Sequence, residues 1–425
     1  MFRVRNNMNL WLVLLVSSQL LIGEIWGNVI VVNLEPNEED VLPFNVPKKQ
    51  ADVIKSILQM YRNSLIVFPE FDLSKWGIAT DGRDHVHNYV TPIPKEELCN
   101  NAQDFMRDIF CAPNNNAILL HIIEESGDKY YSSMVYVANS TLKQIIRKKE
   151  NYHNSILDPY TEAQNNIIQY NDMNITVIMG FDILDMKKPT DDVIYINNIF
   201  KPILPFFLDV SLMSGLSKVY NVDVQAPNYD YSGSHRQSVV HINAKTGLQE
   251  NEYKVKKEMN YYDIDKNNFT LQKITENSAK IESCEVNIEN GDTTNYRLVW
   301  FRGEYEINLK LRNLTVCALV KTTSDNGSLT IKLDEPKPSS FGKITLILKT
   351  SKEEYPLPTT LTANMMPVKN YEFKSTDTGF ELSADDAESL ISFGFILGNV
   401  NHSSYLDGRL GAIYWIVLIF VRLLI

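Results

Sequence analysis

The chain has 425 residues, of which 44% are hydrophobic and 22% are charged. This composition is typical of a globular protein and excludes an intrinsically disordered chain, and the length is enough for about two domains. The formal net charge of -11 argues against electrostatic binding of nucleic acid or of an anionic membrane surface. We therefore expect no nucleic-acid partner.

Residues 1–27 have the pattern of a secretory signal peptide. A basic residue, Arg3, precedes the apolar segment 10–22, and small Gly27 stands where cleavage could follow. A permanent transmembrane helix would need about 18 uninterrupted apolar residues, whereas polar residues 17–19 interrupt this segment. We predict that the mature chain begins near Asn28 and enters the secretory pathway.

Residues 401–425 resemble the signal for a glycosylphosphatidylinositol (GPI) anchor. Leu410 to Ile425 is apolar except for Arg422 and follows a polar stretch, which matches the polar spacer and the tail of about 10 to 20 apolar residues in such signals. The alternative is a transmembrane helix, but this tail is shorter than the about 20 residues that span a bilayer. We therefore expect an anchor in the outer leaflet of the plasma membrane, on the extracellular face. Four residues are small enough to carry it: Asn399, Asn401, Ser403 and Ser404.

Between these two signals, the first part of the chain, residues 28–260, alternates strand and helix patterns. Short β-branched runs predict strands, and apolar residues at helical spacing predict helices. The expected strands are Val29–Leu34, Leu65–Phe68, Ala117–Ile123, Ser133–Val137, Ile175–Met179 and Val222–Gln225, and the expected helices are Lys48–Asn63 and Phe206–Tyr220. Buried strands separated by helices indicate an α/β layer fold.

From about Tyr261 the pattern changes to short alternating runs separated by Gly, Asn, Asp and Pro. Such runs predict a C-terminal antiparallel β module over residues 261–400. Its expected strands are Asn268–Ile274, Tyr296–Phe301, Tyr305–Leu311, Thr315–Thr322, Leu329–Leu333 and Lys343–Lys349. The charged segment Lys254–Glu258 is the expected linker between the two domains.

Six N-glycosylation sequons agree with passage through the secretory pathway. They begin at Asn139, Asn174, Asn268, Asn313, Asn326 and Asn401. We expect Asn174 to be a poor acceptor because it lies beside a buried strand, and Asn401 falls where the chain would be processed for the anchor.

Four cysteines in an oxidising compartment suggest two disulfides. Cys99 and Cys111 lie in the first half of the chain, whereas Cys284 and Cys317 lie in the second. Of the three possible pairings, we prefer the local one, Cys99 with Cys111 and Cys284 with Cys317, because it respects the expected domain boundary. The alternative is a free reactive thiol.

The stretch Ile175 to Asp185 is the centre of the expected chemistry. It reads as a buried strand that ends in a tight strand-to-helix turn, and turns of this kind present nucleophiles. The turn residue is Gly180, which has no side chain that could attack a substrate. Glu70 follows another buried strand and is a candidate general base, and Lys148 is a candidate cation that could stabilise an oxyanion.

These residues resemble the vanin (pantetheinase) and biotinidase branch of the nitrilase, or carbon-nitrogen hydrolase, superfamily. Val67-Phe68-Pro69-Glu70 is similar to the glutamate motif of that branch, and Cys111 to Lys129 is similar to its second strand region. Thr176 to Leu184 is similar to the nucleophile segment, whose family pattern is Thr-Cys-Phe-Asp-Ile. The resemblance covers roughly Val29 to Glu258, and the β module and anchor signal extend it over the whole chain.

The resemblance implies a nitrilase-like four-layer αββα sandwich followed by the C-terminal β module. It also implies that Glu70 is the general base and Lys148 the oxyanion-stabilising lysine, while Gly180 replaces the catalytic cysteine. The family hydrolyses pantetheine or biotin amides through a thioester on that cysteine, and glycine cannot form one. The family implies no cofactor.

Two further sets of residues have alternative interpretations. His85 and His87 lie on one face of an expected extended segment and could form half of a metal site, but no third ligand is evident, so we expect no metal. Asp182 and Asp185 could be imagined as replacement nucleophiles. Cysteine-bearing relatives also have aspartate at the position of Asp182, so we expect a structural role there.

Three functional hypotheses follow. The first is an inactive, lipid-anchored pseudoenzyme that binds a small molecule or another surface protein through a vestigial pocket. The second is an active amidohydrolase in which Glu70 activates water. The third is a structural surface protein without a pocket. The missing thiol favours the first, because losing the nucleophile removes most of the rate enhancement of a concerted catalytic set.

Overall fold

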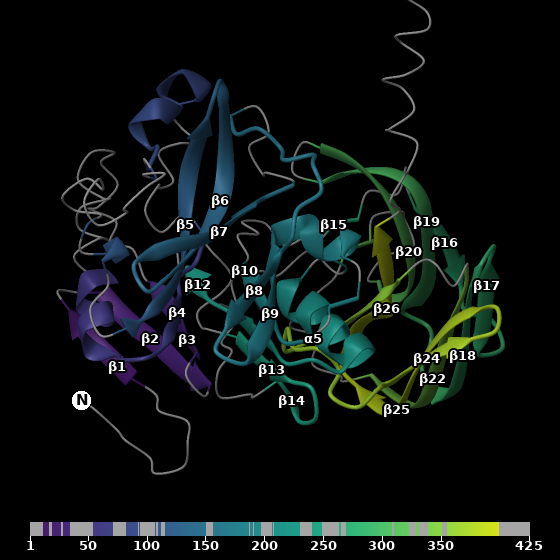
Figure 1. The fold of residues 1–425 in the computed structure, drawn as a ribbon. Helices are drawn as coiled ribbons and strands as arrows, with labels where there is room; N and C mark the ends of the chain where they lie inside the picture. The colour runs from purple at the N-terminus through teal and green to yellow at the C-terminus, as the bar shows by residue number, and fades with distance from the viewer. Residues whose placement is uncertain are drawn as a thin grey trace, which may run out of the picture.

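In the computed structural model, the described residues form four main sheets and few helices (Figure 1). It describes residues 12–16, 19–26, 29–34, 54–70, 82–91, 93, 107, 109–111, 115–149, 156–186, 188–189, 191–196, 206, 208–229, 240–248, 263–264, 269–307, 310–322, 329–330, 339–350 and 355–398. Within these ranges, no helix is long and apolar enough to cross a membrane.

The first sheet is mixed and has the strand order β1-β2-β3-β4-β5-β6-β7, with β12 paired to β3. Strands β3, β4 and β5 run parallel, while the strands on either side of them are joined as antiparallel pairs. The bounds are Leu12–Val16 (β1), Gln19–Trp26 (β2), Val29–Leu34 (β3), Leu65–Val67 (β4), Ala117–Ser126 (β5), Lys129–Ala138 (β6), Thr141–Arg147 (β7) and Asn228–Tyr229 (β12). Strands β1 and β2 fall within the expected signal peptide, which stays a prediction.

The second sheet is also mixed, with the order β14-β13-β11-β10-β9-β8. Its central strands β9, β10 and β11 are parallel. The bounds are Ile167–Tyr170 (β8), Met173–Met179 (β9), Val193–Ile196 (β10), Val224–Ala226 (β11), Val240–Asn243 (β13) and Gly247–Leu248 (β14). Parallel strands need long connections, which is why these strands lie far apart in the sequence.

The two sheets pack face to face and are covered on their outer faces. On β3, Val29 and Val31 join the core between the sheets, whereas Ile30 and Val32 point to the opposite face and contact the helical residues 54–60. Strands covered on both faces are expected to be continuously apolar, as Val29 to Val32 of β3 are. The outer face of the second sheet packs against α5 (Asp209–Tyr220), which completes an α-β-β-α order of layers.

Two antiparallel sheets follow in the C-terminal part of the chain, and Figure 1 shows them on the far side of α5. The inner sheet, β16-β19-β20-β26-β23, contacts α5, and the outer sheet has the order β17-β18-β22-β25-β24. The inner strands are Thr270–Lys273 (β16), Tyr296–Ile307 (β19), Lys310–Lys321 (β20), Leu357–Thr362 (β23) and Leu390–Gly398 (β26). The outer strands are Ser278–Ile281 (β17), Cys284–Gly291 (β18), Ser340–Lys349 (β22), Glu372–Thr376 (β24) and Gly379–Glu388 (β25). A separate short pair joins Asp263–Ile264 (β15) to Leu329–Thr330 (β21).

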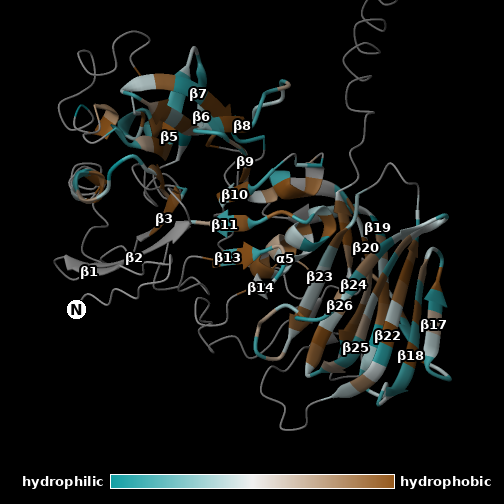
Figure 2. Cartoon of the chain, turned by 60° about the horizontal axis from the view of Figure 1, so that its bottom comes forward, coloured by the Kyte–Doolittle hydropathy of each residue, from teal (hydrophilic) through white to brown (hydrophobic). Residues whose placement is uncertain are grey.

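Side chains that alternate between the two faces of each strand explain how these sheets pack. Val316, Ala318 and Val320 of β20 face α5, while Cys317 and Leu319 face the outer sheet. The outer sheet has one polar face, and Figure 2 shows hydrophobic and hydrophilic residues alternating along β22 and β18. The expected α/β layer fold followed by an antiparallel β module is therefore confirmed.

Helix α5 approaches the inner sheet unusually closely. A Cβ added at Gly215 would lie 2.1 Å from the carbonyl oxygen of Pro358 in β23, so only glycine fits there. Ser211 donates a hydrogen bond to the carbonyl of Thr360 (2.8 Å), and Thr359 donates one to the carbonyl of Phe206 (2.9 Å). Each such bond contributes about 1 kcal/mol, and together they fix the helix between the second sheet and the C-terminal sheets.

One of the expected disulfides is described in full. Cys284 in the outer sheet is bonded to Cys317 in the inner sheet, as the preferred pairing predicted. Cys111 is also disulfide-bonded, and its expected partner, Cys99, lies outside the described residues.

Two expectations from the sequence were wrong in detail. The expected strand Tyr305–Leu311 is divided between β19 and β20, because the same alternation runs through both arms of a hairpin and does not locate the turn. The segment around His85 and His87 is a 3-10 helix, η2 (Arg83–Asn88), rather than extended. With about three residues per turn, residues two apart do not share a face, and both imidazoles are exposed.

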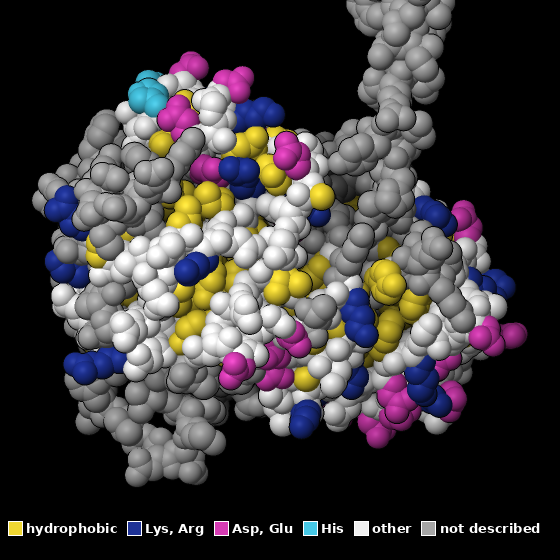
Figure 3. All heavy atoms as spheres, viewed as in Figure 1, with side chains coloured by type: hydrophobic (Ala, Val, Ile, Leu, Met, Phe, Trp, Pro, Cys, Tyr) yellow, Lys and Arg dark blue, Asp and Glu magenta, His cyan; other side chains and the backbone are white. Residues whose placement is uncertain are grey.

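Other elements agree closely with expectation. Residues 54–60 of the expected helix are helical, and α5 begins at Asp209 within the expected range Phe206–Tyr220. The expected linker Lys254–Glu258 and the boundary between residues 260 and 261 lie outside the described residues, as do residues 401–425. Figure 3 shows acidic and basic side chains interspersed over the described part of one face of the molecule.

Candidate functional site

The candidate site lies where strands of the first sheet end beside a turn of the second. Glu70 follows β4, and the backbone amide of Phe68 continues the strand pairing by donating to the carbonyl of Leu119 (3.0 Å). Glu70 is then 1% exposed. A buried carboxylate requires a partner, because an isolated charge is very costly to remove from water.

Lys148 is that partner. Its Nζ lies 2.6 Å from Oε1 and 2.8 Å from Oε2 of Glu70, and the residue is 4% exposed. It follows β7, and its backbone is fixed on both sides: its amide donates to the carbonyl of Ser132 (2.8 Å), and its carbonyl accepts from the amide of Tyr160 (3.1 Å). The structure thus brings together two residues that are 78 positions apart in the sequence.

Gly180 is the third predicted site residue, and it lies beside Lys148. Strand β9 ends at Met179, and the 3-10 helix η4 (Gly180–Asp185) begins at once, which is the expected strand-to-helix turn. Gly180 has a φ of +52°, and a Cβ built on it would lie 2.9 Å from Cε and 3.1 Å from Nζ of Lys148. The lysine therefore borders the space where a side chain at position 180 would begin.

A buried tyrosine holds the backbone of the turn at Gly180. The hydroxyl of Tyr195, in β10, donates a hydrogen bond to the carbonyl of Gly180 (3.1 Å), and Tyr195 is fully buried. Gly180 is thus held at a left-handed backbone angle that glycine adopts without a steric penalty.

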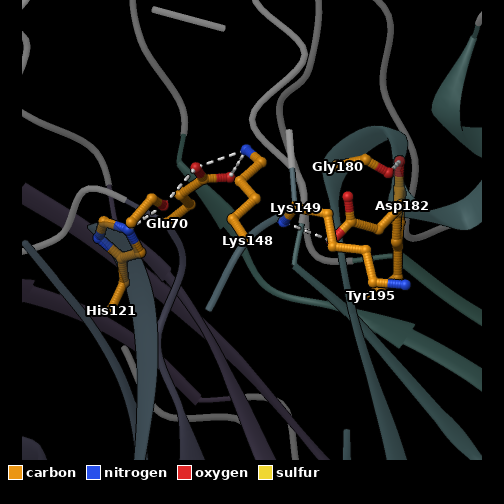
Figure 4. A network of polar contacts seen from close by, with 8 residues as sticks. Glu70, His121, Lys148, Lys149, Gly180, Asp182 and Tyr195 are labelled. Atoms are coloured by element: carbon orange, nitrogen blue, oxygen red, sulfur yellow. Dashed lines mark hydrogen bonds and ion pairs between the residues drawn. The ribbon is translucent and has the colours of Figure 1, made fainter. Parts of the chain in front are cut away.

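Behind Glu70 lies a chain of hydrogen bonds that the sequence reasoning missed (Figure 4). Nε2 of His121 lies 2.8 Å from Oγ of Ser132, which donates to Oε1 of Glu70 at 3.3 Å. Burial and the nearby charge of Lys148 hold the pKa of His121 well below its ordinary value. The imidazole is therefore neutral, and its Nε2–H is the donor to a serine that in turn donates to the carboxylate.

Signals for these two residues exist in the sequence but are weak. His121 is the one polar residue in the apolar run Ala117–Ile123, and Ser132 interrupts the strand that follows. A polar residue within a buried strand must find a hydrogen-bond partner. Nothing in the sequence says that this partner is linked to Glu70.

A second ion pair fixes the end of β7 next to Lys148. Arg147 donates two hydrogen bonds to Glu124, from Nε at 2.8 Å and from Nη2 at 2.5 Å, and Ser133 donates to the same carboxylate at 2.9 Å. The guanidinium lies over the rings of Tyr131 and Tyr160, about 5 Å from each centroid. Hydrogen bonding to Glu124 raises the pKa of Arg147. This clamp limits the freedom of the residue that carries the site's cation.

Of the two aspartates in the turn, the side chain of Asp182 is described, and it contacts the backbone. Oδ2 of Asp182 accepts a hydrogen bond from the backbone amide of Lys149 at 3.1 Å, which ties η4 to the segment after β7. This contact agrees with the structural role expected for Asp182. The side chain of Asp185 lies outside the described residues, and Lys149 itself is exposed.

Among the described residues, no three His, Cys, Asp or Glu side chains come together in a group that could hold a metal ion. Of the sequon asparagines, Asn139 and Asn174 are exposed and Asn313 is half-buried. Asn174 lies at the exposed start of β9, so burial does not block it. Whether it carries sugar stays a prediction. Asn268, Asn326 and Asn401 lie outside the described residues, as do the anchor candidates Asn399, Ser403 and Ser404.

The arrangement can hold charge but supplies no nucleophilic side chain at the turn. Three hydrogen bonds reach Glu70, two from Lys148 and one from Ser132, and they occupy most of the lone pairs that a general base would use. Both members of the ion pair are already satisfied by each other. The described residues thus form a buried hydrogen-bonded network beside the backbone of Gly180.

The C-terminal part of the chain matches a known protein family. Residues 256–401 match the model of the vanin C-terminal domain. No curated protein matches the sequence.

Solved structures similar to this chain include members of the nitrilase superfamily. A carbon-nitrogen hydrolase superfamily protein from Xanthomonas campestris is 12% identical, with a TM-score of 0.37, over 51% of this chain and 83% of that one. Nit3 of Saccharomyces cerevisiae, a member of branch 10 of the superfamily, is 17% identical, with a TM-score of 0.38, over 49% and 80%. A glutamine-dependent NAD+ synthetase from Acinetobacter baumannii is 12% identical, with a TM-score of 0.38, over 52% and 42%.

Proposed function

We propose that this vanin-like protein, whose residues 256–401 match the model of the vanin C-terminal domain, is an inactive carbon-nitrogen hydrolase homologue. In this proposal it is secreted, carries a GPI anchor on the outer leaflet of the plasma membrane, and acts by binding. The family resemblance of Glu70, Lys148 and the turn at Gly180 supports the assignment of the first domain.

The proposal that the protein is inactive rests on one observation: the turn that would present a nucleophile has only backbone at Gly180. Covalent amide hydrolysis needs a side chain that attacks the carbonyl carbon and forms an acyl-enzyme. Lys148 borders the position but is paired with Glu70 through both carboxylate oxygens. An ammonium group has no lone pair for attack, so the lysine does not replace the thiol.

The second hypothesis, an amidohydrolase in which Glu70 activates water, is less well supported. A general base must lie within hydrogen-bond reach of the water and must have a free lone pair directed at it. Glu70 is 1% exposed and already accepts three hydrogen bonds. A water would have to displace Lys148 or Ser132 before Glu70 could accept its proton.

The activity test compares four proteins on a fluorogenic pantetheine amide. They are the parent protein released from the cell surface, Gly180→Cys, Gly180→Ala and Glu70→Ala. We expect no turnover by the parent or by Gly180→Ala. Turnover by the parent that is lost in Glu70→Ala would contradict the proposal and establish the water mechanism.

The anchor is tested separately on cells that express the full chain. A phospholipase C specific for phosphatidylinositol should release the protein into the medium, because it cuts a GPI anchor but not a polypeptide. Retention on the cells after this treatment would identify the apolar C-terminal tail as a transmembrane segment instead.

A further inference from the structure

A cleft lies well away from Glu70 and Gly180, at the opposite ends of the strands that carry them. It has a volume of about 980 Å³ and is open to solvent, which places it within the size range of sites for small ligands, about 300–1,000 Å³. Its walls come from both sheets of the first domain: β6 and the turn after it on one side, and β8 with its following turn on the other.

Side-chain amides dominate the walls of this cleft. Asn or Gln makes up more than half of the lining residues, and Lys143 is the cation among them, while no carboxylate is present in the lining. Each amide offers both a donor and an acceptor. Such a surface complements a ligand that is rich in hydroxyl and amide groups and carries no positive charge.

The floor of the cleft is rigid. The hydroxyl of Tyr136 donates to the carbonyl of Gln169 (2.7 Å), and the hydroxyl of Tyr170 donates to the carbonyl of Asn63 (2.7 Å). Each bond joins one sheet to the other. Both tyrosines are nearly buried, and burial raises the pKa of both phenols. The two tyrosines, 4% and 6% exposed, therefore form a fixed base for the cleft.

The sequon at Asn139 opens directly onto this cleft. Asn139 and Ser140 form the two-residue turn between β6 and β7, with φ angles of +52° and +56°, which fits a type I′ hairpin turn. Asn139 lines the cleft and is exposed. A sugar attached to its Nδ2 would therefore begin at the rim of the cleft.

We propose that the cleft holds the inner sugars of an N-linked glycan attached to Asn139. The inference rests on the proposed passage through the secretory pathway. The N-acetyl amides and hydroxyls of these sugars are the groups that the amide-rich walls complement. Attachment at the rim keeps the sugars at a high effective concentration, so weak contacts suffice to hold them.

The test measures how fast an amidase that removes N-glycans, peptide N-glycosidase F, acts on the native secreted protein. Asn174 is the matched reference, because it is an exposed sequon on the same domain that does not line the cleft. Any other occupied sequon serves if Asn174 carries no sugar. We expect release from Asn139 to be at least about tenfold slower than release from the reference, since docking reduces the accessible fraction, and equal rates after denaturation.

A variant of the cleft wall separates docking from local crowding. Lys143→Ala removes the exposed cation of the wall while keeping both sequons and the neighbours of Asn174 intact. We expect release from Asn139 to accelerate toward the rate at the reference sequon. The control is Lys374→Ala, an exposed residue on the outer C-terminal sheet, which should leave the rate unchanged.

The outcomes distinguish the two proposals. Absence of sugar at every sequon would overturn the secretory proposal. Sugar at other sequons but none at Asn139 would overturn the cleft proposal alone. Native release from Asn139 at the same rate as from the reference, or no acceleration in the wall variant, would also overturn it.

Discussion

Lys148 and Gly180 approach each other so closely that a Cβ on the glycine would lie 2.9 Å from Cε of the lysine. The contact joins the end of β7 in the first sheet to the end of β9 in the second. Two features of position 180 therefore oppose a side chain: the positive φ and the lysine. Both can be tested by substitution: Lys148 could move only by loosening its two hydrogen bonds to Glu70, and the backbone at position 180 is held by Tyr195.

Gly180→Cys should restore a reactive thiol at a cost in stability. A left-handed angle costs a non-glycine residue about 1–2 kcal/mol, and Lys148 must shift. Once formed, the thiolate would be stabilised by the adjacent ammonium, which lowers a cysteine pKa. We expect faster reaction with iodoacetamide than for an exposed model thiol, and some amidase activity. Gly180→Ala has the same backbone cost without the thiol. A Cys variant as inert as the Ala variant would show that the surrounding pocket has also decayed.

The Glu70–Lys148 pair should behave as a coupled unit in denaturant unfolding. Removing one member leaves a buried charge without its partner, which costs about 3–5 kcal/mol. We therefore expect Glu70→Gln and Lys148→Met each to be strongly destabilising, and the double variant to lose much less than the sum. A double-mutant cycle measures this coupling. Additive losses would contradict a direct interaction between the two residues.

Stability should fall as the pH is lowered below about 6.5, the pKa of an unfolded histidine. His121 is neutral when folded because its pKa is well below the ordinary value, so the unfolded chain binds one more proton in this window. Stability then rises with pH, by up to about 1.4 kcal/mol per unit, until the unfolded histidine is also neutral. His121→Gln should flatten this part of the curve, whereas exposed His85→Gln should leave it unchanged. Identical curves for parent and His121→Gln would exclude this residue as the cause.

Loss of the Cys284–Cys317 disulfide should weaken the C-terminal sheets. The bond links β18 of the outer sheet to β20 of the inner sheet across 33 residues. Removing a native disulfide from a secreted domain typically costs about 2–5 kcal/mol. We expect Cys284→Ala combined with Cys317→Ala to lower the midpoint of chemical denaturation by a matching amount. An unchanged midpoint would mean that the packed core alone holds the two sheets together.

Cleavage after residue 27 should leave a folded protein. Strands β1 and β2 lie at the edge of the first sheet, and β3 keeps its pairing with β4 and β12 when they are absent. N-terminal sequencing of the secreted protein should begin near Asn28. A secreted protein that retains Leu12–Val16 would contradict the signal peptide.

Most strands and the class of fold could be predicted from sequence, because burial on one or two faces leaves a local pattern. Val29–Leu34 matches β3 at both ends, and the turn at Gly180 follows from a strand that stops at a glycine. Prediction failed where two conformations share the same sequence pattern. The alternation of apolar and polar residues could not divide Tyr305–Leu311 between two strands. The sequence around His85 could not distinguish the 3-10 helix η2 from an extended segment.

The sequence alone thus determined which residues are available: a glutamate after one strand, a lysine after another, and glycine at the turn. It could not determine that they meet, because contacts between residues 78 positions apart depend on sheet order and register. Only the tertiary structure decided that Glu70 is enclosed by Lys148 and by the Ser132–His121 chain, and that Lys148 borders the space at Gly180. The physical reason is that each residue's chemical groups can be read from the sequence. The burial of a side chain and its distance from other side chains arise only when the two sheets pack face to face.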